Sequence, residues 1–119
     1  LALKVVFHSK EDTQTLIFDE IDTGVSGKVA FKMGEKMHAL SKQYQVLCIT
    51  HLASVAAWAD THYRVVKEVV GQESQTKVES LNASQTIDEL AMMTSGQISS
   101  RSQNAALELK ERIQEILHG

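Results

Sequence analysis

The chain contains no proline and only one cysteine, Cys48, among its 119 residues. A single cysteine excludes an internal disulfide and is typical of proteins from a reducing compartment such as the cytosol. No apolar run reaches the roughly 18 residues that a membrane-spanning helix needs. The sequence also lacks low-complexity tracts and internal repeats, and we see no basic leader followed by a long apolar stretch. These absences predict a cytoplasmic protein.

The balance of charge gives no sign of a specialised surface. The net charge is −3, and acidic and basic residues are mixed at similar density in both halves of the chain. A nucleic-acid-binding domain usually has a basic face, so this composition does not indicate one. With 43% hydrophobic residues, the chain can bury a small core as one domain.

Apolar periodicity predicts an α/β fold in which strands and helices alternate. The predicted strands are Thr15–Asp19, Gln45–Thr50, Tyr63–Val70 and Thr76–Leu81, the last two forming a small antiparallel hairpin. The predicted helices are the last turns of one at Leu1–Phe7, then Ser26 (N-cap) to about Leu40, His51–Ala59, Thr86–Met93 and Gln103–Leu117. The predicted buried stripes are Ala30, Met33, Met37 and Leu40 in one helix, and Ala106, Leu109, Ile113 and Ile116 in the last. Because residues 15–50 form a β-α-β unit with a right-handed crossover, we expect a mostly parallel sheet flanked by helices.

Two adjacent acids, Asp19 and Glu20, follow the first strand, which we expect to be buried. In α/β nucleotide-hydrolysing enzymes, acids at such a strand end hold magnesium and activate water. Asp19 suits the first role and Glu20 the second, although two acids can also cap a strand into a solvated loop. A phosphate-binding loop belonging to this site should lie upstream, where no such loop occurs. We therefore expect one part of an ATPase.

His51 follows the second predicted strand, so Thr50 and His51 should reach the same sheet edge as the acids. A neutral histidine there can donate a hydrogen bond to a γ-phosphate oxygen, but it can equally cap the next helix. The segment Asp22–Gly27 holds two glycines that allow a tight turn beyond the acids. An ordinary β–α connection would look the same.

The order of these features resembles the C-terminal half of an ABC-type ATPase head, with its Walker B, D-loop and H-loop motifs. The run Asp19-Glu20-Ile21-Asp22 is similar to the SMC-type branch. Within that branch the chain resembles the RecN family of bacterial double-strand-break repair proteins, and the matching segments are 16–27, 46–52, 55–60, 62–65 and 89–93. Ser26 stands where most ABC-type heads have aspartate, and Ala53 where RecN-like chains often have proline.

The resemblance implies that residues 1–119 are the C-terminal lobe of a P-loop ATPase head, without Walker A, signature motif or coiled coil. The intact protein would bind ATP and Mg²⁺, act on DNA near the nucleoid and form a homodimer. Asp19 would hold the metal, Glu20 and His51 would be catalytic, and all three would contact the nucleotide. The head–head interface would be lined by Asp22, Thr23, Gly24, Val25, Ser26 and Gly27. Without the N-terminal part of its own head, the chain should be inactive.

Two alternatives remain open from the sequence. The chain could come from another SMC-like or ABC-type head, such as that of a chromosome-organising protein. It could also be a small non-catalytic module that self-associates through an exposed apolar face.

Overall fold

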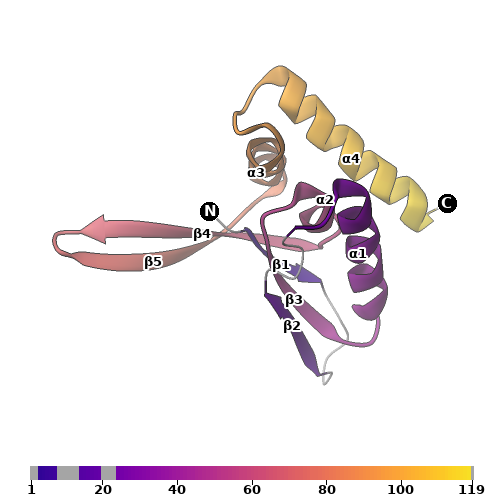
Figure 1. Cartoon of the computed structure of the whole chain (residues 1–119), viewed down its shortest axis with the longest axis horizontal. Coiled ribbons are helices and arrows are strands. Elements are labelled where there is room, and N and C mark those ends of the chain that lie inside the picture. The colour runs from indigo at the N-terminus through magenta and orange to yellow at the C-terminus, as the bar shows by residue number, and fades with distance from the viewer. Residues whose placement is uncertain (1–2, 8–13, 20–23, 119) are drawn as a thin grey trace.

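The computed structural model describes residues 3–7, 14–19 and 24–118, with backbone only for 3–7. Five strands and four helices occur in this part of the chain (Figure 1). In order they are β1 (Leu3–Phe7), β2 (Thr15–Asp19), α1 (Gly27–Leu40), β3 (Gln45–Thr50), α2 (Ala53–Ala56), β4 (Thr61–Val70), β5 (Glu73–Ser80), α3 (Ala83–Ser95) and α4 (Ser100–His118). None of these helices is long and apolar enough to cross a membrane.

The strands form one sheet in the order β2-β3-β1-β4-β5. The predicted parallel pairing of β2 with β3 is confirmed. The prediction of a mostly parallel sheet is wrong, because β1 pairs antiparallel with both β3 and β4, and β4 pairs antiparallel with β5. The fold is therefore mixed α/β, with one parallel and three antiparallel pairings.

The prediction of a helix over residues 1–7 is also wrong, because Leu3–Phe7 is strand β1. A short, continuous apolar run fits a buried strand as well as a helix, so periodicity cannot distinguish the two. Here the run lies between β3 and β4 and forms ladders with both. Pairing on both sides gives its backbone N–H and C=O groups hydrogen-bond partners away from water. These ladders make the strand the stable conformation of the run.

In the described part of the chain, helices pack against one face of the sheet and none covers the other. Val46, Cys48 and Thr50 of β3 are buried, and the first two belong to the same apolar cluster as Ala30 and Met37 of α1. On edge strand β2, Phe18 packs against this cluster, whereas Ile17 on the opposite face is 68% exposed. The prediction of a buried strand at residues 15–19 is therefore wrong, because the described helices cover only one of its faces.

Helix α1 begins where the sequence predicts. The Ser26 side chain accepts a hydrogen bond from the Val29 N–H at 3.3 Å, which is N-capping geometry. Ala30, Gly34 and Met37 are the buried residues of α1. Leu40, predicted to be buried, is exposed, because the inward stripe runs through Gly34 instead.

The hairpin of β4 and β5 extends well beyond the rest of the sheet (Figure 1). Arg64 of β4 links the hairpin to α3. Its guanidinium donates to Glu79 Oε2 of β5 at 2.5 and 3.2 Å and lies 3.6 Å from a carboxylate oxygen of Glu89 in α3.

The two final helices start earlier than predicted. Ala106 and Ile113 of α4 are buried as expected, but Ile116 is exposed.

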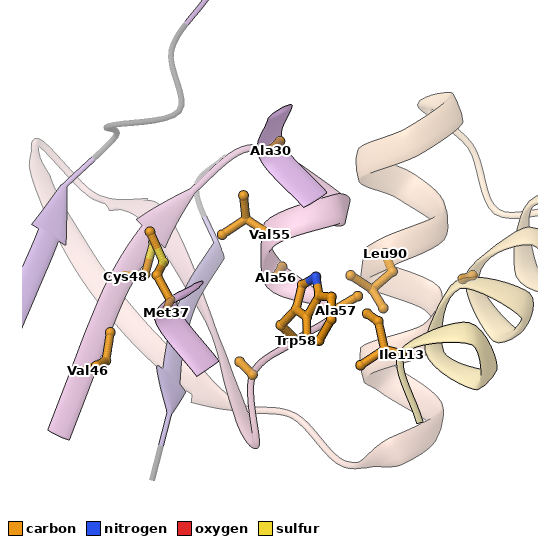
Figure 2. Close-up of a cluster of buried hydrophobic side chains, with 12 residues drawn as sticks. Ala30, Met37, Val46, Cys48, Val55, Ala56, Ala57, Trp58, Leu90 and Ile113 are labelled. Carbon is orange, nitrogen blue, oxygen red and sulfur yellow. The ribbon is translucent and has the colours of Figure 1, made fainter. Parts of the chain in front are cut away.

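Trp58, just after α2, is the largest fully buried side chain and is 2% exposed. Figure 2 shows its indole among buried side chains from several elements, including Leu90 of α3 and Ile113 of α4. Its ring also meets Phe31 of α1 edge to face, with 5.0 Å between the centroids. Gly34 lies so close that an added Cβ would be 2.2 Å from Trp58 Cδ1.

We therefore expect Gly34→Ala to destabilise the chain. The methyl group cannot fit beside the indole, and overpacking of this kind costs about 1–3 kcal/mol. Urea- or heat-induced unfolding measures the loss. Gly27→Ala is the matched control on the same helix, because the nearest atom to its Cβ would be Ser54 Oγ at 4.0 Å. Equal stability of the two variants would contradict this account of the core.

His62 should make stability depend on pH. It is 3% exposed, and its Nε2 donates to the Ala56 carbonyl at 2.7 Å. The pKa of His62 lies below the usual 6.5, chiefly because burial disfavours the charged ring. The hydrogen bond to Ala56 raises the pKa, the charge of Lys110 lowers it and the charge of Asp60 raises it, and the net shift is downward. Between the folded-state pKa and 6.5 the unfolded chain binds more protons, so the free energy of unfolding should fall as pH drops below 6.5.

Urea unfolding between pH 7.5 and 5 measures this dependence. His62→Gln should flatten the curve in this range, because the group that is held neutral in the folded state is gone. His118→Gln, which alters an exposed histidine near the end of α4, is the control. An unchanged pH profile in His62→Gln would exclude His62 as the source.

Candidate site at the ends of strands β2 and β3

Two of the predicted site residues reach the same edge of the sheet. In the parallel register of β2 and β3, Asp19 lies opposite Ile49, which precedes His51 by two residues. Asp19 and His51 are both exposed. Because the carboxyl ends of parallel strands form the usual ligand-binding edge of such sheets, this pairing brings Asp19 and His51 to one place on the surface.

The backbone after β3 is held by Thr50. This residue is fully buried, and its Oγ1 accepts a hydrogen bond from the Leu52 N–H at 3.0 Å. The bond fixes the turn in which His51 sits between the strand and α2. The predicted helix over His51–Ala59 is wrong in its bounds, because helix α2 spans only Ala53–Ala56. His51 therefore lies in the turn before this helix.

The predicted interface loop leads directly into α1. Gly24 has a φ of +80°, a left-handed conformation that favours glycine. Val25 is half-buried against the core, Ser26 caps the helix and Gly27 is its first residue. Within the described residues of the loop, Gly24 therefore adopts a conformation that only glycine adopts readily, as a tight turn needs.

Three predicted site residues, Glu20, Asp22 and Thr23, lie outside the described residues. Their roles as general base and as interface residues stay predictions. Within the described part, no group of three or more histidine, cysteine, aspartate or glutamate side chains comes together as a metal site. Magnesium at nucleotide sites is often held by only one or two carboxylates together with phosphate oxygens and waters, and Asp19 suits that kind of site.

Two hollows were not predicted from the sequence. The first, of about 770 Å³, lies between the start of β4, α3 and α4, and contains His62 and Lys110. Burial lowers the pKa of Lys110, and Asp60 opposes this. The second, of about 640 Å³, lies between α1 and α4 and contains Gly27, Lys28, Lys32 and Arg112. No signal in the sequence indicates this groove, because its lining residues come from helices far apart along the chain.

Comparison with known proteins identifies relatives among DNA repair proteins named RecN. No family model matches the chain. It is 47% identical over 96 residues to the DNA repair protein RecN of Bacillus subtilis, a match that covers 81% of the chain and 17% of that protein. It is 44% identical over 110 residues to RecN of Rickettsia conorii, covering 92% of the chain and 20% of the relative.

A third relative, RecN of Xylella fastidiosa, is 39% identical over 117 residues, covering 98% of the chain and 21% of the relative. These matches do not favour the alternative of a chromosome-organising protein. The chain therefore belongs with the RecN family, as a segment that spans about a fifth of the length of these relatives.

Proposed function

We propose that the chain is the C-terminal lobe of a RecN-type ATPase head, and that the intact protein hydrolyses ATP in the repair of DNA double-strand breaks. The observation that carries this proposal is the parallel pairing of β2 and β3, which brings Asp19 and His51 to one sheet edge in a RecN-like sequence. The DNA repair role is supported by the names of the relatives.

In this proposal Asp19 helps to hold Mg²⁺ at the exposed end of β2. The metal, when bound, offsets negative charge on the β- and γ-phosphates. A carboxylate at a strand end is suitable because its backbone is fixed by the ladder with β3, while its oxygens remain accessible to a nucleotide.

Glu20 acts as the general base: it orients a water molecule and accepts its proton as the water oxygen bonds to the γ-phosphorus. The bond from that phosphorus to the bridging oxygen of the β-phosphate breaks, and ADP leaves. His51 donates a hydrogen bond to a γ-phosphate oxygen from the turn that Thr50 holds. His51 thereby distinguishes ATP from ADP, because only ATP presents the γ-phosphate. Phosphoryl transfer depends mainly on such positioning and charge stabilisation.

The segment Asp22–Gly27 lines the contact between two heads, so that ATP is enclosed in a homodimer. Another part of the same head supplies the phosphate-binding loop, and the signature motif comes from the opposite head. A repair ATPase of this kind would act in the cytoplasm at the nucleoid, and ATP-driven head engagement would be coupled to DNA binding.

Glu20→Gln in the intact protein should lower ATP turnover by about 10²–10⁴-fold, the usual contribution of a general base. ATP binding should persist, so ATP-bound dimers should accumulate. Steady-state turnover, together with size-exclusion chromatography in ATP, tests both effects. Glu73→Gln, an exposed acid in the hairpin, is the matched control. Turnover equal to that of the control would remove Glu20 from the mechanism.

Asp19→Asn should change the dependence of the intact protein on Mg²⁺. Because altered outer-shell partners alone cost about 10–100-fold in metal affinity, the loss of a direct ligand should raise the half-saturating Mg²⁺ concentration by at least about tenfold. A magnesium titration of ATP turnover measures the shift. Glu111→Gln, on the exposed side of α4, should leave the titration unchanged. An unaltered midpoint in Asp19→Asn would rule out the proposed metal role.

A further inference from the structure

Helix α1 presents a row of lysines to solvent. Lys28, Lys32 and Lys36 follow one another at four-residue intervals, and all three are exposed. With 3.6 residues per turn and a rise of 1.5 Å, they lie within an arc of about 80° and along about 12 Å of the helix. The three ammonium groups therefore form a nearly straight line of positive charge.

Little negative charge opposes this row. Glu35 is the sole acid in α1, and its carboxylate lies 3.8 Å from Lys32 Nζ. The Lys32 side chain is 68% exposed and that of Glu35 41%, so the pair contributes little to stability, and Lys32 can exchange Glu35 for another anion. The row keeps a positive surplus although the chain as a whole carries a net charge of −3.

Helix α4 adds a fourth cation. Arg112 lies with its guanidinium carbon 4.3 Å from the centroid of the Phe31 ring of α1. It lines the same groove of about 640 Å³ as Lys28 and Lys32, and Glu35 is the groove's one acidic lining residue in the described part of the chain. Contact with the Phe31 ring holds this charge next to the row, where a cation above an aromatic face is favoured.

We propose that Lys28, Lys32, Lys36 and Arg112 form a contact surface for the phosphodiester backbone of duplex DNA. A duplex carries one negative charge per about 1.7 Å of its axis, so a 12 Å row faces about seven phosphate charges. A straight, evenly spaced row of lysines suits such a regular polyanion better than the irregular charges of an acidic protein segment. Contacts of this kind position DNA without reading its sequence.

This inference rests on the proposed function, since DNA is taken as the partner from the repair role. It goes further by assigning the contact to one surface of α1 and α4. The surface is formed by residues other than the acids and the histidine at the ends of β2 and β3, so nucleotide chemistry and DNA contact can be altered separately.

The test is duplex binding by the full-length protein, measured by fluorescence anisotropy over a range of salt concentrations. In Lys28→Gln/Lys32→Gln the slope of log K against log salt should fall by about two, one for each lost phosphate contact. Affinity at 0.15 M salt should drop by about 25-fold, since each contact is worth about fivefold there. Two duplexes of unrelated sequence should be affected equally.

Lys67→Gln/Lys77→Gln is the matched control, because it removes the same charge from exposed positions of the hairpin. Its binding should stay within twofold of wild type. Unchanged binding in the α1 double variant would overturn this inference without affecting the proposed function. The lysine row would then be a candidate contact surface for an acidic protein. Equal losses in both double variants would also overturn it. No duplex binding by the wild type would overturn both the inference and the DNA role in the proposed function.

Discussion

The close packing of Trp58 against Gly34 is the contact on which the helical layer depends. It allows α1 to approach the indole to a distance that no side chain with a Cβ permits. Phe31 then meets the indole edge to face, and Arg112 of α4 covers Phe31. The arrangement has a cost, because Trp58 Nε1 is buried without a hydrogen-bond partner in the described part of the chain, a penalty of about 1–3 kcal/mol. Shape complementarity must outweigh that penalty.

Two of the proposed surfaces depend on this contact through the position of α1. The N-terminal end of α1 continues from the loop of the proposed head–head contact, and its exposed side carries the lysine row. Because a packed helix moves as a rigid unit, a shift at Gly34 would move Ser26 and Lys32 together. The proposed head–head contact and the proposed DNA-contacting surface therefore share one packed helix.

Local signals were sufficient for the elements that the sequence predicts well. Strand β3, the N-cap of α1 and the β4–β5 hairpin each have a turn, cap or alternating pattern within a few residues. Strand β1 has no such signal, since its identity depends on partners that lie 39 to 61 residues away. For the site, the shared edge of Asp19 and His51 follows from parallel pairing alone. The groove beside Arg112 does not, because it requires the packing of α4 on α1.

Exposed apolar side chains lie on the face of the sheet opposite the helices. By register, Ile17 of β2, Val65 and Val69 of β4 and Val78 of β5 alternate onto the face opposite the helices. Val69 is 76% exposed and Val78 56%, whereas the other face of the hairpin carries the pairs Arg64–Glu79 and Lys77–Glu68. Lys67 and Thr76 lie on the valine-bearing face as well, so this face is only partly apolar. In a segment spanning about a fifth of its relatives, the exposed valines are apolar surface whose burial would be favourable. Its patterning is better matched to a larger assembly than to this segment in isolation.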